Sequence, residues 1–189
     1  NTLVEETASA PPGGLKPATG KARRARPAAF TALNGTNEAP ARIQIGVEEL
    51  DRVFGGGVVP ASATLIGGDP GIGKSTLLLQ VAARLAHNGL SSVYVSGEEA
   101  TAQIQDRARR LKVAERPVQL ATETDLRKVL AALQDVRPDF VVVDSIQTMW
   151  SDSLEAAPGS VSQVGACGQG LVRWAKTSGA ALILVGHVT

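Results

Sequence analysis

The sequence predicts an α/β fold in which a mostly parallel sheet is covered by helices on both faces. Two observations lead to this prediction. From residue 42 onward, short apolar segments alternate with longer segments of helical periodicity, which is the order of elements in a parallel sheet with crossover helices. The short segments are apolar throughout rather than at every second position, which is typical of strands buried on both faces.

The first 41 residues differ from the rest of the chain. Pro, Gly, Ala and Thr dominate them, and neither a strand-like nor a helix-like apolar period is sustained. Such a segment buries too little apolar surface to offset the entropy of ordering it. We therefore predict a flexible linker over residues 1–41 and a folded domain over residues 42–189. The basic side chains of the linker could touch nucleic-acid phosphates, although a solvated tether is the simpler interpretation.

The first elements of the predicted domain lie around two glycine-rich stretches. Residues 47–54 favour a short helix, and the three glycines at 55–57 end it. Residues 63–66 form a short apolar strand that enters a glycine-rich loop. A helix follows over residues 74–87, with apolar side chains at helical spacing at Leu77, Leu78, Val81, Ala82 and Leu85, and Asn88-Gly89 closes it.

The middle of the domain continues the alternation. Residues 93–95 predict a strand, residues 98–112 a helix with Ile104, Ala108 and Leu111 on one face, and residues 118–120 a brief strand. Thr124 is expected to cap the next helix. The apolar side chains of that helix follow the i, i+3, i+4, i+7 pattern at Leu126, Val129, Leu130 and Leu133.

The last elements are two apolar strands with a helix between them. Residues 140–143 form a strand that ends at Asp144, and residues 181–185 form the final strand. Residues 160–177 predict a helix whose buried stripe includes Cys167, a small core residue in this interpretation. The glycines at 165, 168 and 170 each cost this helix about 1 kcal/mol relative to alanine, so we expect its order to be weak. Trp150 is expected to anchor the loop after Asp144.

Composition excludes several classes of protein. With 19 basic and 18 acidic side chains the net charge is +1, which excludes a histone-like protein. No apolar run reaches the roughly 18 residues of a membrane span, and the N-terminus lacks the layout of a secretory signal. A single cysteine excludes a disulfide framework or a multi-cysteine metal site within this chain. We expect a cytoplasmic protein without a membrane partner.

The strongest motif is a phosphate-binding loop of the form Gly-x-x-x-x-Gly-Lys-Ser. The nucleotide-binding set that it predicts is Gly68, Asp69, Pro70, Gly71, Ile72, Gly73, Lys74, Ser75 and Thr76. Backbone N–H groups of such a loop wrap an anion. Lys74 is expected to reach the β- and γ-phosphates, and Ser75, with Thr76 behind it, to offer a hydroxyl to Mg²⁺. A glycine-rich turn with an incidental lysine is the weaker alternative.

Three further candidates lie where predicted strands end. Asp144 follows a buried strand, where it could hold Mg²⁺ together with Ser75; a helix-capping role is the alternative. Glu98 follows the strand over 93–95 and could polarise the water that attacks the γ-phosphate, although an acidic residue in a first helical turn is also ordinary. His187 ends the last strand and could donate to the γ-phosphate, or could be structural or simply exposed.

Several of these runs together resemble the RadA (Sms) family of bacterial DNA repair proteins, which is RecA-like. The resemblance covers roughly residues 41–189, and the opening residues 1–6 look like the segment that follows the zinc module of that family. The runs that carry the resemblance are residues 50–60, 67–75, Tyr94-Val95-Ser96-Gly97-Glu98-Glu99, Val143-Asp144-Ser145-Ile146-Gln147-Thr148 and residues 185–189.

The resemblance implies a RecA-like P-loop NTPase core and a DNA-dependent ATPase of helicase or translocase type. In that family the protein binds single-stranded DNA and recombination intermediates, works with a RecA-type recombinase, promotes branch migration and forms a hexameric ring. It implies ATP and Mg²⁺ as cofactors, with Lys74, Ser75 and Asp144 as the ATP–Mg²⁺ set. The resemblance also implies that Glu98 is the glutamate that activates the attacking water, with Glu99 as its neighbour. It implies that His187 senses the γ-phosphate and that the loop over 151–160 moves against DNA.

The sequence also departs from the family. The four-cysteine zinc module is absent, and the Lys-Asn-Arg-Phe-Gly motif and Lon-protease-like domain would lie beyond Thr189. We therefore expect a fragment that is truncated at the C-terminal end of its fold and is poorly active. Gly165 stands where an arginine is expected, and Ala61 where a glycine is usual. The alternatives are a RecA-like regulatory module without significant turnover and a small-molecule kinase, although no arginine-rich lid supports the kinase.

Overall fold

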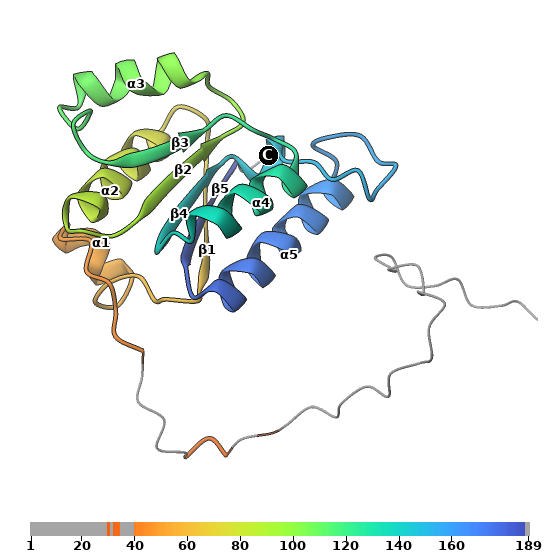
Figure 1. Cartoon of the computed structure of the whole chain (residues 1–189). Helices are drawn as coiled ribbons and strands as arrows, with labels where there is room; N and C mark the ends of the chain where they lie inside the picture. The colour runs from red at the N-terminus through yellow and green to blue at the C-terminus, as the bar shows by residue number, and fades with distance from the viewer. Residues whose placement is uncertain (1–29, 31, 35–39, 188–189) are drawn as a thin grey trace, which may run out of the picture. The chain divides into compact units, whose positions relative to one another are not determined.

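Five parallel strands form the centre of the fold (Figure 1). They are β1 (Ala63–Gly68), β2 (Ser92–Ser96), β3 (Val118–Ala121), β4 (Phe140–Asp144) and β5 (Ala181–His187), and their spatial order is β1-β5-β4-β2-β3. Every neighbouring pair is parallel. The predicted parallel sheet is therefore confirmed, and each strand lies within two residues of its predicted bounds.

The computed structural model describes residues 30, 32–34 and 40–187. The predicted linker over residues 1–41 lies almost entirely outside the described residues, so it stays a prediction. A compact unit begins at Pro40. Its helices are α1 (Glu48–Val53), α2 (Lys74–His87), α3 (Thr101–Arg110), α4 (Leu126–Val136) and α5 (Val161–Ser178), with a short 3₁₀ helix, η1 (Ile146–Thr148). No described helix has the length and apolar character that a membrane span requires.

Helices cover both faces of the sheet because successive strand residues point to opposite sides. In β4, Val141 and Val143 pack with α4 and α5, whereas Phe140 and Val142 pack with α2 and the segment around Ile45. All five residues of β4 are buried, as expected for a central strand with two covered faces. The predicted fold class, a parallel sheet with helices on both faces, is therefore confirmed.

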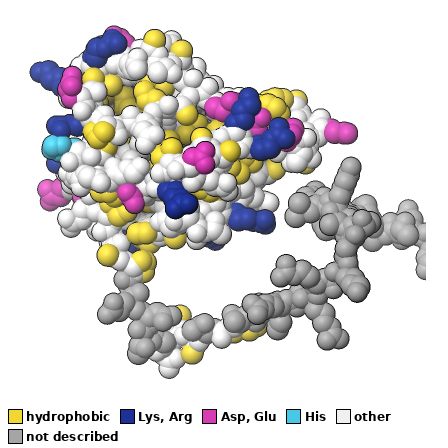
Figure 2. All heavy atoms as spheres, in the orientation of Figure 1, with side chains coloured by type: hydrophobic (Ala, Val, Ile, Leu, Met, Phe, Trp, Pro, Cys, Tyr) yellow, Lys and Arg dark blue, Asp and Glu magenta, His cyan; other side chains and the backbone are white. Residues whose placement is uncertain are grey.

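The edge strand β3 is less completely covered than the central strands, since none of its residues is fully buried. Figure 2 shows hydrophobic side chains gathered on the face that carries β3 and α4. Between these two elements an open groove of about 310 Å³ is lined by apolar side chains that include Val95, Leu120, Val129 and Val136. The burial of apolar surface therefore falls off toward this edge of the sheet.

Two predicted helix starts are wrong. The helix expected over residues 98–112 begins at Thr101, because the hydroxyl of Ser96 accepts a hydrogen bond from the Glu99 N–H (3.0 Å) and holds residues 98–100 in a turn. Thr124 does not cap α4. Asp125 is the cap, and its Oδ1 accepts from the Arg127 N–H at 2.9 Å.

The expected weakness of the helix after residue 160 is also wrong. Helix α5 is continuous over 18 residues, from a Ser160 cap to Gly179, whose φ of 88° ends it. The buried stripe of Cys167, Leu171 and Trp174 faces α4 and the sheet. Each large apolar side chain buried this way contributes about 2 kcal/mol, which outweighs the low helix propensity of the glycines. Cys167 is a buried core residue, as predicted.

Replacing Ala61 with glycine is expected to stabilise the fold. Ala61 has a φ of 58° in the left-handed region, and its N–H donates to the Gly179 carbonyl at 2.9 Å. A side chain in this conformation costs about 1 kcal/mol, which a glycine avoids. We expect Ala61→Gly to raise the melting temperature by about 2 °C, as measured by circular dichroism. Ala102→Gly, in exposed helix α3, is the control and should lower it.

Candidate nucleotide-binding site

The predicted phosphate loop joins the end of β1 to the start of α2. Gly71 and Gly73 have φ values of 81° and 97°, a conformation that favours glycine. Helix α2 begins at Lys74, so the backbone N–H groups of its first turn and their partial positive charge are directed toward the loop. This is the local arrangement that binds phosphate groups.

Lys74 is folded back onto the loop. Its side chain is buried, and its ammonium group donates to the carbonyl oxygens of Gly68 (2.7 Å) and Asp69 (2.8 Å). The lysine therefore holds the loop together through two main-chain acceptors. These carbonyls are weaker partners for an ammonium than phosphate oxygens, because a charged acceptor makes a stronger hydrogen bond than a neutral one.

Asp144 lies at the end of β4, beside the end of β2, where it pairs with Ser96. The carboxyl group is buried, and its Oδ2 accepts a hydrogen bond from the hydroxyl of Tyr94. Its Oδ1 is buried and has no hydrogen-bond partner among the described residues. Leaving such a buried oxygen unpaired is costly, and a hydrated cation would satisfy it. The oxygen donors of Asp144 and Ser75 are the kind that Mg²⁺ prefers, so these residues fit that ion.

Glu98 lies at the centre of a small polar cluster. Its Oε1 accepts hydrogen bonds from the Ser145 hydroxyl (2.6 Å) and contacts Nε2 of His187 (2.9 Å). Partial burial opposes ionisation, but the hydrogen bonds from Ser145 and His187 and the nearby charges of His187 and Lys74 together lower the pKa of Glu98 below its ordinary value. The carboxylate is therefore ionised at neutral pH and available as a hydrogen-bond acceptor.

The adjacent Glu99 has a different environment. Its two carboxylate oxygens pair with the guanidinium group of Arg107, at 2.6 and 3.0 Å, and the arginine side chain is only 13% exposed. This two-point contact joins the turn after β2 to helix α3. The fold thus separates two consecutive acidic residues, with Glu98 in the polar cluster and Glu99 in an ion pair.

Three residues that complete the site, Tyr94, Gly97 and Ser145, are not among those predicted from the sequence. The Gly97 N–H donates to the Asp144 carbonyl at 2.9 Å, and a Cβ at this position would lie only 1.9 Å from Oγ1 of Thr148. Only glycine fits this close approach. Tyr94 could have been found as the one side chain with a polar tip in the predicted strand over residues 93–95. Ser145 carries no comparable signal.

The loop over residues 151–160 follows η1, which itself follows β4 at the same edge of the sheet. Trp150 is joined to Thr124, with its indole N–H 3.2 Å from the threonine hydroxyl, so Trp150 anchors the start of this loop as predicted. The amide of Gln163, which is 1% exposed, hydrogen-bonds main-chain groups of Ser151, Leu154 and Ala156 at 2.8–3.3 Å. The loop is thereby wrapped around one side chain of α5.

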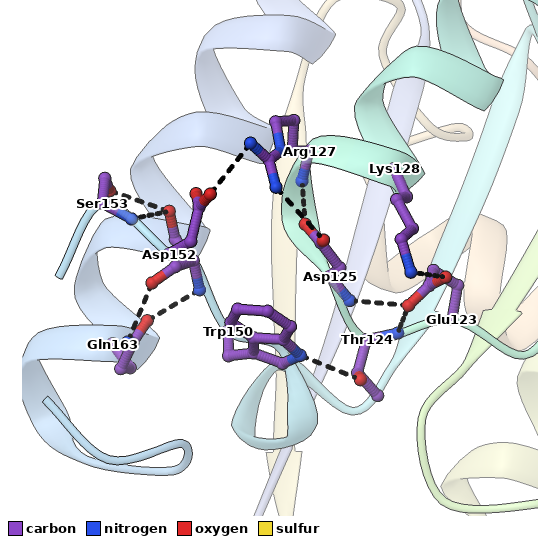
Figure 3. A network of polar contacts seen from close by, with 10 residues as sticks. Glu123, Thr124, Asp125, Arg127, Lys128, Trp150, Asp152, Ser153 and Gln163 are labelled. Atoms are coloured by element: carbon purple, nitrogen blue, oxygen red, sulfur yellow. Dashed lines mark hydrogen bonds and ion pairs between the residues drawn. The ribbon is translucent and has the colours of Figure 1, made fainter. Parts of the chain in front are cut away.

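Charged side chains connect this loop to helix α4. Arg127 of α4 contacts Asp152 of the loop at 2.8 Å, and beside this pair Lys128 contacts Glu123, in the segment before α4, at 3.2 Å (Figure 3). In Figure 2, acidic and basic side chains are interleaved around the start of α4. The loop itself carries Asp152 and Glu155 and no lysine or arginine, so its side chains do not present a basic surface.

The fold brings all four predicted catalytic residues to the carboxyl edge of one sheet. The phosphate loop follows β1, Asp144 ends β4, Glu98 follows β2 and His187 ends β5. In parallel sheets this edge is where ligands bind. Among the described residues, no three His, Cys, Asp or Glu side chains gather as a metal site of their own. A phosphate loop with a buried carboxylate beside it defines the class of P-loop nucleotide-binding domains.

Comparison with known proteins leads to a more specific assignment. A family model described as AAA domain matches residues 38–189, and the chain belongs to this family. The chain is also similar along its whole length to the DNA repair protein RadA of Brucella abortus (52% identical), of Bacillus subtilis (44%) and of Pseudomonas aeruginosa (44%). It spans only 41–42% of the length of these relatives. The resemblance to RadA predicted from the sequence is thereby confirmed.

Proposed function

We propose that this chain is the ATP-binding and ATP-hydrolysing part of a DNA repair protein that binds single-stranded DNA and promotes branch migration in recombinational repair. The observation that carries the proposal is the meeting of the phosphate loop, Asp144, Glu98 and His187 at one edge of the sheet. The similarity to proteins named DNA repair protein RadA supports the repair function. From the family resemblance described under the sequence analysis, we also propose a hexameric ring and a RecA-type recombinase as a partner.

Each residue has a defined part in this proposal. Lys74 exchanges its two loop carbonyls for the β- and γ-phosphates of ATP. Ser75 and Asp144 would hold Mg²⁺, which would neutralise charge on the phosphates. Glu98 accepts a hydrogen bond from the attacking water and orients it. Ser145 and His187 hold the Glu98 carboxylate in place, and His187 contacts the γ-phosphate.

The DNA contact is proposed through the loop over residues 151–160. This loop follows directly from the strand that ends at Asp144, so a shift at the nucleotide reaches it through η1. Because the loop is acidic, its main-chain groups rather than its side chains would approach the phosphate backbone. Arg127 would then exchange Asp152 for a DNA phosphate.

ATP turnover by the full-length protein, with and without single-stranded DNA, tests this function. We expect DNA to stimulate turnover several-fold, and the stimulation to fall as salt is raised. Turnover of this 189-residue chain, measured beside it, is expected to be weak and insensitive to DNA. If the full-length protein binds ATP but neither hydrolyses it nor responds to DNA, the function is that of a nucleotide-dependent regulatory module instead.

A further inference from the structure

Tyr94 lies beneath the nucleotide site, in the middle of β2. Its side chain is fully buried and packs on the α2 face of the sheet with Phe140 and Val142. Asp144 is two residues beyond Val142 on the neighbouring strand, so its side chain points to the same face. The phenol hydroxyl therefore meets the Asp144 carboxylate under the start of α2, where Ser75 lies next to it.

The hydroxyl of Tyr94 forms a hydrogen bond with one of the two carboxylate oxygens of Asp144. A phenol has a single proton to donate, and here it is given to Oδ2 of Asp144. An ordinary phenol keeps its proton at neutral pH, so the Tyr94 hydroxyl acts as a donor in this contact. The other oxygen, Oδ1, is buried without a partner in the described part of the chain.

Packing alone does not require this difference between the two carboxylate oxygens of Asp144. A phenylalanine at position 94 would fill the same space, and the hydroxyl adds a donor for Asp144 and a contact with Ser75, the other proposed Mg²⁺ ligand. We propose that Tyr94 is a positioning residue that holds Oδ2 of Asp144 and thereby leaves Oδ1 as the oxygen available to the hydrated Mg²⁺ of the bound nucleotide. The inference rests on the ATP–Mg²⁺ site proposed above.

Tyr94→Phe tests the proposal in the full-length protein, because it removes only the hydroxyl. The Mg²⁺ concentration for half-maximal ATP turnover is expected to rise about tenfold, which is the effect of losing one hydrogen bond to a charged group. The additional thermal stabilisation that Mg²⁺ gives to the ADP-bound protein is expected to shrink. Stabilisation by ADP in the presence of EDTA, which does not involve the ion, is expected to be unchanged.

Ser92→Ala is the matched control. Ser92 lies on the same strand, and its buried hydroxyl has no hydrogen-bond partner among the described residues. We expect this variant to have the Mg²⁺ dependence of the wild type. If Tyr94→Phe keeps the wild-type half-saturating Mg²⁺ concentration, or lowers it, Tyr94 is a packing residue and the inference is wrong. If the wild type itself shows no Mg²⁺ dependence, the proposed ATP–Mg²⁺ site is wrong instead.

A second readout does not depend on the folding of Tyr94→Phe. With 3-fluorotyrosine placed at position 94, the ¹⁹F resonance reports the surroundings of the phenol in an otherwise unchanged protein. We expect it to shift when Mg²⁺ is added to the ADP-bound protein. ADP added in EDTA is expected to leave it nearly unmoved. A ¹⁹F resonance that does not shift when Mg²⁺ is added would show that Tyr94 has no positioning role.

Discussion

Lys74→Ala is expected to abolish nucleotide-dependent thermal protection and to lower ATP turnover by about a hundredfold or more. Lys74 is the cation at the centre of the phosphate loop, and its ammonium group is poised on the carbonyls of Gly68 and Asp69. Without it, the loop offers phosphate groups only backbone N–H donors. Melting curves with and without Mg²⁺-ATP, read beside a turnover assay, measure both effects.

The control for this substitution is Lys176→Ala. Lys176 is exposed in the last turn of α5, which leads into the amino end of β5, at the opposite edge of the sheet. We expect it to keep both nucleotide protection and turnover. Lys74 also ties the loop together, so the nucleotide-free melting temperature must be compared as well. If Mg²⁺-ATP protects the Lys74→Ala variant against thermal unfolding as well as it protects the wild type, the proposed phosphate-binding role of the loop is wrong.

Glu98→Gln is expected to lower turnover by about a hundredfold while changing nucleotide affinity by less than about twofold. Glutamine has the shape of glutamate and still accepts from Ser145, but it lacks the negative charge that the proposed mechanism uses to orient the attacking water. The pKa of Glu98 is lowered, so in this mechanism the carboxylate is a weak base that positions the water and does not take up its proton. Single-turnover hydrolysis and equilibrium binding of a fluorescent nucleotide separate the two quantities.

Glu99→Gln is the matched comparison, because it makes the same chemical change one residue later. It weakens the ion pair with Arg107, so we expect a lower melting temperature with turnover largely retained. A Glu98→Gln variant that lost affinity as strongly as turnover would make Glu98 a structural residue. If Glu99→Gln loses turnover and Glu98→Gln keeps it, Glu99 rather than Glu98 is the residue that orients the water.

The order and type of the elements could be predicted because their apolar patterns are long and consistent. Helix α2 and strand β4 have the predicted bounds, since their burial patterns are those of a covering helix and a central strand. The start of α3 could not be predicted in this way. Glu98 and Glu99 resemble the acidic first turn of a helix, but the Ser96 hydroxyl binds the Glu99 N–H and holds these residues in a turn.

The candidate site was predicted to the extent that its residues end strands or carry a motif. Parallel strands bring their carboxyl ends together, which is why Asp144, Glu98 and His187 could be expected near the phosphate loop. The contacts between side chains could not be predicted, because they depend on strand register and side-chain direction. The Tyr94–Asp144 hydrogen bond and the close approach of Gly97 to Thr148 are examples.

The wrapping of residues 151–160 around Gln163 has a consequence for how this protein can change over evolution. The side-chain amide of Gln163 binds main-chain groups of the loop, and every amino acid except proline supplies those groups alike. Part of the path of the loop is therefore encoded outside the loop, on α5. A side chain such as Glu155 can be exchanged for others that suit a different ligand while these main-chain contacts persist.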